Sequence, residues 1–127
     1  MPKKEVITVP GFKGLGPYSM AVRSAGLLFV SGQPGINSAT GEAVGTTFEA
    51  QARQAFKNLE AVLKAGGSDL SLVVNTTISI ADMAFFPELN KLFLEFFPEN
   101  PPARMASQVP LPKGLLISIG CVAAVKE

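Results

Sequence analysis

The sequence predicts an α+β fold in which two helices pack on one face of a single β-sheet, with the elements in the order β-β-β-α-β-α-β-β. Three observations support this prediction. Apolar residues follow a helical spacing in two segments, they alternate with other residues in several more, and glycine-rich or proline-rich turns separate the segments. The length of 127 residues and the apolar fraction of 47% fit one domain over residues 1–127.

The first part of the chain predicts three strands. Residues 5–9 form a short β-prone run, and residues 19–25 and 27–33 form two more that predict a hairpin turning at the glycine between them. Residues 11–17 are rich in glycine, but no Gly-Lys-Ser/Thr follows, so a turn is favoured over a phosphate-binding loop. Residues 37–42, NSATGE, have the composition of a turn.

A long helix comes next. Thr46 and Glu49 fit a capping box at its start, and Gly66 with Gly67 end it. The residues expected to face the sheet follow helical spacing: Phe48, Ala52, Ala55, Phe56, Leu59, Val62 and Leu63.

A strand over residues 71–80 and a second helix over residues 85–97 follow. Alternation in the strand predicts that one side chain in two faces the core: Leu72, Val74, Thr76, Ile78 and Ile80. Pro87 fits the first helical turn, where no backbone N–H is needed. The apolar stripe of this helix is interpreted as core rather than as a cofactor site: Phe86, Leu89, Phe93, Phe96 and Phe97.

Two strands, over residues 103–109 and 115–125, complete the chain. In the first, Arg104, Ala106 and Gln108 share a face. In the second, the odd-numbered residues should pack under the helices, while the even-numbered ones form a second face that is also apolar or small: Leu116, Ser118, Gly120, Val122 and Ala124. A monomer would expose this face as an apolar patch, so we expect subunits to pack against it.

The composition excludes several kinds of chemistry and partner. The chain has no histidine and a single cysteine, Cys121, which rules out His-based triads, the usual zinc sets and an intramolecular disulfide. We therefore expect no metal site. A net charge of +1 disfavours nucleic acid, and no apolar run approaches the ~20 residues of a membrane span. Without an apolar segment at the N-terminus, a cytoplasmic protein is expected.

Three places in the sequence are candidates for a binding site. Arg104 is one of three arginines, and no acidic residue lies between Glu99 and Glu127 to pair with it. It fits either a plain surface arginine or a receptor whose fork of N–H donors binds a carboxylate. Tyr18 is the only tyrosine, and Ser31 with Gly32 ends a strand where backbone N–H groups can face a ligand.

Seven motifs in order along the chain resemble the reactive intermediate deaminase family. This is the Rid or YjgF-like family, whose members are often labelled endoribonuclease L-PSP or translation initiation inhibitor. The motifs are GPYSMAV at 16–22, LFVSGQ at 28–33, ATGE at 39–42, QARQAFKNLEAVLKAGG at 51–67, VVNTTISIADMAFFPELNKLFLEFF at 73–97, PPAR at 101–104 and LPKG at 111–114.

The resemblance implies a chorismate-mutase-like fold, assembled as a homotrimer with clefts between subunits. It also implies hydrolysis of reactive 2-imino or enamino acids to 2-keto acids and ammonia, without a cofactor. The family's hallmark arginine follows Pro-Ala and binds the substrate carboxylate, and Arg104 matches it. Tyr18 in Gly-Pro-Tyr, with Ser31 and Gly32 in Ser-Gly-Gln, matches further cleft positions.

The last strand departs from the family pattern. Deaminating members have a stretch resembling VEIEAIA, whereas this chain has ISIGCVA, so Ser118 and Gly120 replace two glutamates. The resemblance assigns the attacking water to the second of them. Ala106 stands where the family often has a cysteine two residues after the arginine. Losing a general base typically costs ~10²–10⁴-fold in rate.

Three functions follow as alternatives. The first is an imine or enamine deaminase with Arg104 and Tyr18 as its main site residues, weakened by the missing glutamate. The second is a non-catalytic regulatory protein that binds small carboxylates such as keto acids. The third, an RNA-cleaving translation inhibitor, is disfavoured because the sequence has no basic stripe.

Overall fold

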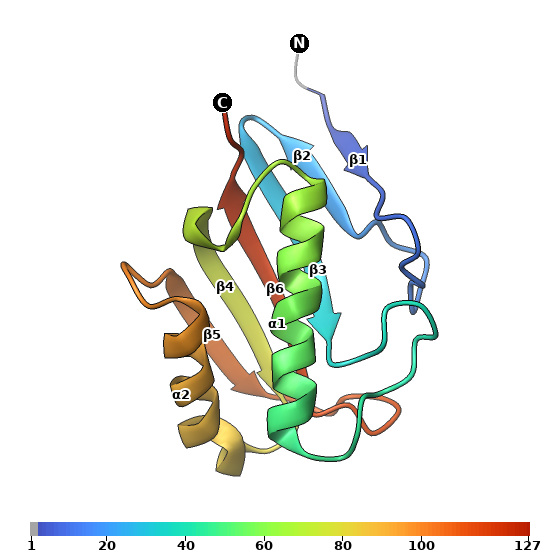
Figure 1. Cartoon of the computed structure of the whole chain (residues 1–127), viewed down its shortest axis with the longest axis vertical. Coiled ribbons are helices and arrows are strands. Elements are labelled where there is room, and N and C mark those ends of the chain that lie inside the picture. Colours follow the sequence, from blue (N-terminus) through green and yellow to red (C-terminus); the bar gives the residue numbers. More distant parts are fainter. Residues whose placement is uncertain (1–2) are drawn as a thin grey trace.

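The structure, a computed structural model, describes residues 3–127. It confirms the predicted order of strands and helices, with one six-stranded mixed sheet and both α-helices on the same face of it (Figure 1). The elements are β1 (Glu5–Ile7), β2 (Ala21–Ser24), β3 (Leu27–Pro34), α1 (Phe48–Ala65), β4 (Val73–Ile80), α2 (Phe86–Phe96), β5 (Ala103–Gln108) and β6 (Ile117–Ala124).

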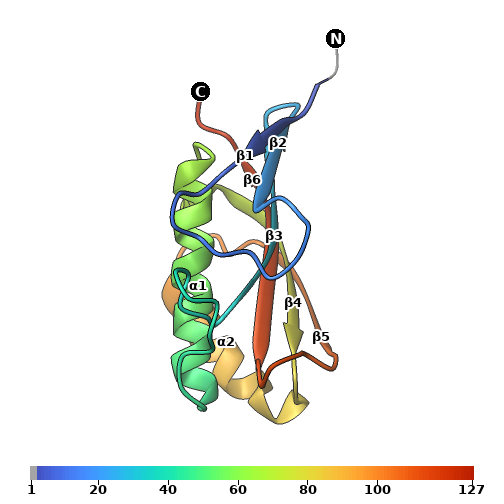
Figure 2. The ribbon, with the colours of Figure 1, turned by 90° about the vertical axis from the view of Figure 1, so that its right-hand side faces the viewer.

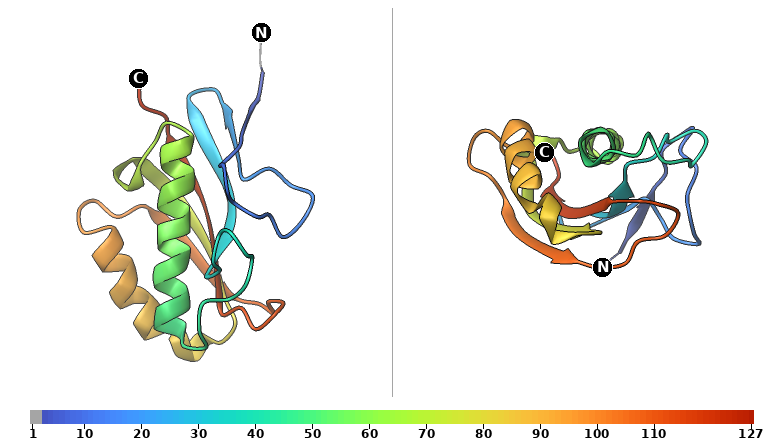
Figure 3. Two further views of the ribbon diagram at one scale, coloured as in Figure 1. Left: turned by 45° about the vertical axis from the view of Figure 1, so that its right-hand side comes forward. Right: turned by 90° about the horizontal axis from the view of Figure 1, so that it is seen from below.

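The strands lie side by side in the order β1-β2-β3-β6-β4-β5. All neighbours are antiparallel except β4 and β5, which run parallel because α2 forms the crossover between them. The last strand of the chain, β6, therefore lies in the middle, and β1 and β5 form the two edges. A side view shows both helices on one side of the sheet and the other side bare (Figure 2), as does the view from below (Figure 3).

The core lies between the sheet and the two helices. All seven residues of α1 that were expected to face the sheet are buried. Rings from both helices pack together, with Phe56 stacked on Phe96 at 4.5 Å between centroids and edge-on to Phe93 at 6.4 Å. This confirms that the aromatic stripe of α2 belongs to the core, because such pairs add to the stabilisation from apolar burial.

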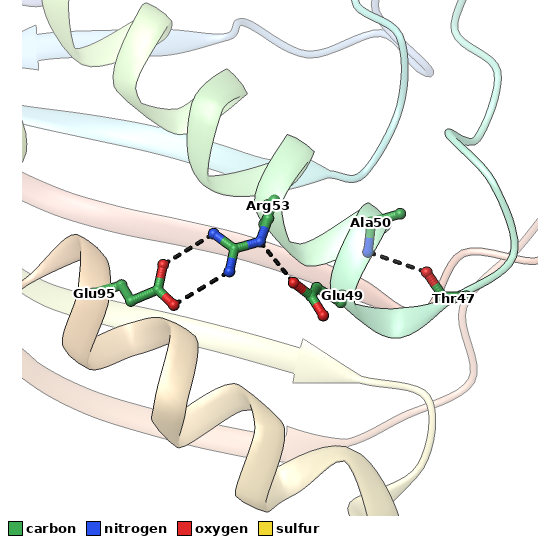
Figure 4. Close-up of polar contacts among 5 residues, drawn as sticks. All are labelled: Thr47, Glu49, Ala50, Arg53 and Glu95. Carbon is green, nitrogen blue, oxygen red and sulfur yellow. Dashed lines mark hydrogen bonds and ion pairs between the residues drawn. The ribbon is translucent and has the colours of Figure 1, made fainter.

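The start of α1 differs from the predicted capping box. Thr47, and not Thr46, is the cap: its backbone is extended and its hydroxyl oxygen accepts a hydrogen bond from the Ala50 N–H at 3.2 Å. Glu49 then falls in the second helical position, from which it cannot reach back to the cap. It instead receives a hydrogen bond from Arg53 at 3.0 Å, and Arg53 makes two more to Glu95 on α2 (Figure 4).

The alternation expected in β4 is broken at its start. Val73 is buried and Val74 is 50% exposed, the reverse of the prediction, because the pairing register with β6 shifts between Val73 and Asn75. Leu72 lies before the strand, in the short 3₁₀ helix Leu70–Leu72. Beyond the shift the prediction is confirmed, and the remaining residues of that face are buried: Thr76, Ile78 and Ile80.

Candidate functional site

The structure divides the sequence-predicted site residues between two places. Five of them lie around the adjacent strands β3 and β6, and we call this group the Tyr18 half-site: Tyr18, Ser31, Gly32, Ser118 and Gly120. The other two, Arg104 and Ala106, lie on the edge strand β5. Strands β6 and β4 separate β3 from β5, and β4 separates β6 from β5, so no strand of the half-site pairs with β5.

Hydrogen bonds fasten the Tyr18 loop to β3. The Ser31 N–H donates to the Met20 carbonyl at 3.0 Å, and the Ser31 hydroxyl donates to the Ser19 carbonyl at 2.6 Å. Tyr18 is 46% exposed and lines a small hollow together with Gly32. The Ser31 side chain therefore positions the loop that carries Tyr18, and Tyr18 itself remains partly exposed.

Two glycines keep this half-site open. A Cβ on Gly32 would lie 2.5 Å from the Ser118 hydroxyl oxygen, and a Cβ on Gly120 would lie 3.2 Å from the Val30 carbonyl oxygen. The pairing of β3 with β6 is irregular between Val30 and Gln33, which is where Gly32 lies. Small residues are needed here because the two strands and the Ser118 side chain approach so closely.

The sequence reasoning missed two buried amides of α1, of which Asn58 also lines the hollow beside Tyr18. Asn58 of α1 donates to the carbonyls of Pro34 and Ile36, at 3.1 and 2.9 Å. Gln51, two helical turns before Asn58, donates to the Gly114 carbonyl at 3.2 Å and accepts from the Leu116 N–H at 2.8 Å. Both are polar residues at helical spacing within the apolar face of α1, and that was the signal available in the sequence.

Arg104 faces α2 rather than the bare side of the sheet. It pairs in register with Thr76, which is fully buried under the helices. Its guanidinium carbon lies 5.3 Å from the ring centre of Phe86 and 5.0 Å from that of Phe93. Both distances are within the range of cation–π attraction, and a guanidinium stacked on a ring by its flat face keeps its N–H edge available.

Arg104 also differs from the other two arginines in its polar contacts. Arg23 is held by Glu5 and by the Gly66 carbonyl, and Arg53 is held by Glu49 and Glu95. Within residues 3–127, Arg104 makes neither a hydrogen bond to a side chain or backbone oxygen nor an ion pair. Its charge and its donors therefore remain for a ligand.

The sheet register places Arg104 and Gly120 on opposite faces of one chain. Arg104, Thr76 and Cys121 lie in one row across the sheet and face the helices. In the next row Thr77 pairs with Gly120, and these residues face the bare side. A cleft that contains both Arg104 and the Tyr18 half-site therefore requires two copies of the chain.

The bare face of the sheet is apolar and hollowed. Two large side chains on it, Phe29 and Met105, are 45% and 66% exposed. A hollow of about 360 Å³ lies over Gly120, and Val22 and Val122 contribute to its walls. Exposure of this kind is typical of a surface that another protein subunit covers.

The described part of the chain offers no conventional nucleophile or metal site. Burial raises the pKa of the Cys121 thiol to about 12, so this thiol stays protonated near neutral pH. Within residues 3–127, no group of three metal-ligating side chains comes together. Over the same residues, none of the helices is both long and apolar enough to cross a bilayer.

Comparison with curated proteins finds close relatives over most of the chain. Reactive Intermediate Deaminase A, chloroplastic, from Arabidopsis thaliana is 43% identical over 95% of this chain, which spans 66% of that relative. The human 2-iminobutanoate/2-iminopropanoate deaminase is 38% identical over 95% of this chain and 89% of its own length. A putative regulator AldR from Lactococcus lactis is 39% identical over 98% of this chain and 99% of its own.

Solved structures share the fold. A putative endoribonuclease L-PSP from Entamoeba histolytica has a TM-score of 0.90 at 36% identity, over 97% of this chain and all of the other. TdcF from E. coli with bound serine has a TM-score of 0.87 at 28% identity, over 96% and 99% of the two chains. The family model described as Endoribonuclease L-PSP matches residues 10–125. The chain therefore belongs to the endoribonuclease L-PSP family, which is the Rid or YjgF-like family expected from its motifs.

Proposed function

We propose that this chain is a cofactor-free deaminase that hydrolyses 2-imino and enamino acids to 2-keto acids and ammonia. The observation that carries the proposal is the Arg104 guanidinium, which has no acidic partner within residues 3–127. Its central carbon lies 5.3 Å and 5.0 Å from the ring centres of Phe86 and Phe93. A guanidinium N–H edge can make two parallel bonds to a carboxylate. Relatives named as 2-iminobutanoate/2-iminopropanoate deaminases support the same chemistry.

The proposed active site lies between two copies in a homotrimer. One copy supplies Arg104 with Ala106 from its β5 edge, and the next supplies the Tyr18 half-site. The apolar bare face of the sheet would be covered in the same assembly, which removes Phe29 and Met105 from water. The opposite orientation of Arg104 and Gly120 within one chain supports this arrangement.

The chemistry needs little from the protein. The carbon of a protonated imine is attacked by water, the resulting carbinolamine loses its amino group as ammonia, and the keto acid remains. Arg104 would fix the carboxylate, and Tyr18 is the proton-carrying side chain at the surface of the other half-site. Since Ser118 and Gly120 carry no carboxylate, a backbone carbonyl or a group from another copy would have to orient the water.

The lack of a carboxylate at positions 118 and 120 favours a second function. With neutral residues at positions 118 and 120, the cleft keeps its carboxylate anchor but lacks a general base, which suits a protein that binds keto acids without turning them over. The relative named as a putative regulator is 39% identical to this chain, about as similar as the human deaminase at 38%.

A coupled assay separates the two functions. 2-Iminobutyrate is generated enzymatically, and its disappearance is followed with wild type, Arg104→Ala and the control Arg23→Ala, which removes an arginine that pairs with Glu5 elsewhere. Calorimetry with 2-ketobutyrate measures binding by the same proteins. Acceleration that is lost only in Arg104→Ala supports the deaminase. Binding without acceleration supports the regulator, and equal binding by Arg104→Ala and wild type rejects both.

Light scattering tests the assembly. We expect a trimer for the wild type and dissociation in Phe29→Lys, which places a charge on the bare face of the sheet. A wild-type protein that remains monomeric at micromolar concentration would contradict the two-copy cleft.

A further inference from the structure

The two rings that contact Arg104 both come from α2. Phe86 is the first residue of the helix and Phe93 lies two turns later, so they share a face of it. The guanidinium carbon lies near both rings, 5.3 Å from the centre of Phe86 and 5.0 Å from that of Phe93. An arginine on an edge strand is thereby held by a neighbouring helix without a single ionic contact in the described part of the chain.

The two rings differ in what else they contact. Phe93 is 7% exposed and packs against Phe56 and Phe97, at 6.4 and 4.8 Å between ring centres, so it is part of the core. Phe86 is half-buried and, within residues 3–127, forms no stacked or edge-on pair with another ring. It packs against the edge of the core, and its cation–π contact is with Arg104.

Such a contact prepares an arginine for binding. A free arginine side chain has many rotamers, and the freedom lost when it binds a carboxylate weakens the binding. Rings that hold the guanidinium before the ligand arrives remove part of that loss and fix the plane of its N–H fork. They do so without offering a carboxylate that would compete with the ligand.

We propose that Phe86 is a positioning residue for ligand binding, which holds the Arg104 guanidinium through its ring so that the N–H edge meets the ligand carboxylate. This rests on the proposed function of Arg104 as the carboxylate anchor. Phe86 itself need not touch the ligand. The property that matters is the electron-rich ring face, not apolar bulk alone, so an aliphatic residue of similar size cannot replace it.

The first experiment compares three variants by their affinity for 2-ketobutyrate. Phe86→Leu keeps most of the apolar volume and removes the ring, and we expect binding about fivefold to tenfold weaker, which corresponds to about 1.0–1.4 kcal/mol. Phe86→Trp introduces a ring that attracts cations more strongly, and the affinity of this variant for 2-ketobutyrate should be within about twofold of wild type. Phe96→Leu is the matched control, because this half-buried ring of the same helix stacks on Phe56 instead.

A double-mutant cycle separates positioning from a general structural effect. If the Phe86 ring acts through the guanidinium, Phe86→Leu should weaken binding much less in an Arg104→Lys background than in the wild type. The same fractional loss in both backgrounds would overturn the proposal, and so would a loss in Phe96→Leu as large as that in Phe86→Leu. Unchanged affinity in Phe86→Leu, with binding abolished in Arg104→Ala, would overturn it while leaving the proposed function intact.

A spectroscopic measurement needs no stable variant at position 86. The chain has three arginines, so its arginine Nε–Hε region holds three resonances, and the one lost in Arg104→Lys belongs to Arg104. Two rings around the guanidinium should shift this proton upfield and order it before ligand is added. An unshifted, mobile resonance in the free wild-type protein would overturn the inference. A wild-type protein that binds no 2-ketobutyrate would instead remove the proposed function on which it rests.

Discussion

Replacing Ser118 by glutamate should raise the rate of imine hydrolysis by about tenfold or more. The Ser118 hydroxyl oxygen lies 2.5 Å from the place that a Cβ on Gly32 would occupy, so a side chain at position 118 lies against Gly32 within the Tyr18 half-site. A carboxylate there could accept a proton from the attacking water. General bases contribute ~10²–10⁴-fold, and an introduced base without evolved neighbours is expected near or below the lower end of that range.

Gly120→Glu should give a smaller gain, although the family resemblance points to position 120. Its Cβ would lie 3.2 Å from the Val30 carbonyl oxygen, so β3 must shift slightly, and overpacking of this kind costs about 1–3 kcal/mol. The new carboxyl would also extend into a hollow whose walls include Val22, Phe29 and Val122. Apolar surroundings raise the pKa of a carboxyl, which leaves less of it ionised as a base.

The assay is the coupled imine measurement, with Ser118→Gln and Gly120→Gln as uncharged controls of nearly the same shape. Binding of 2-ketobutyrate should weaken in Ser118→Glu, because two carboxylates would then share the charge of Arg104. Light scattering must show the same assembly in all variants. Equal rates for Ser118→Glu, Ser118→Gln and wild type would refute the reasoning, since they would mean that position 118 does not face the reacting water.

Three further predictions concern the scaffold. Gln51→Leu leaves the Leu116 N–H without its partner, together with two carbonyls that accepted from the amide, and should lower the free energy of unfolding in urea by about 3 kcal/mol. Because burial raises the pKa of Cys121 to about 12, a thiol reagent at pH 8 should leave it unmodified until urea unfolds the chain; rapid reaction of the folded protein would contradict this. Arg53 holds the pKa of Glu95 below its ordinary 4.5, so the pair stabilises the fold above that pH and the contribution fades as the carboxylate is protonated. The urea midpoints of wild type and Glu95→Gln should therefore converge as the pH falls below 4.5.

The order of elements was predictable because each segment keeps a clear periodicity, but finer details depended on choices that the local sequence leaves open. Two adjacent threonines, Thr46 and Thr47, are equally good caps, and only the packed helix selects the second. Val73 and Val74 are chemically identical, so the residue that enters the core is decided by the register with β6. Such choices depend on contacts between residues far apart in the chain.

The candidate site was also only partly predictable, because some of its features are local in the sequence and others depend on long-range contacts. Arg104 attracts notice in the sequence because no acidic residue lies near it, and the structure shows no ionic partner for it within residues 3–127. Its contact with Phe86 and Phe93 was not predictable, since it depends on how α2 crosses between β4 and β5. The alternation of β6 correctly grouped Ser118 with Gly120, but it could not reveal that Arg104 faces the other side of the sheet.

The position of β5 at the end of the sheet has a consequence for solubility. An edge strand presents unpaired backbone groups that can recruit strands from other molecules, and proteins guard such edges with prolines and inward-pointing or flanking charges. Here Pro101 and Pro102 precede the strand, and Arg104 is the only charged residue within it. Arg104 would then act as a gatekeeper against aggregation as well as a ligand anchor. A neutral substitution at this position would remove both the ligand anchor and the charge that protects the edge strand from aggregation. Selection would then act on the same side chain for two separate reasons.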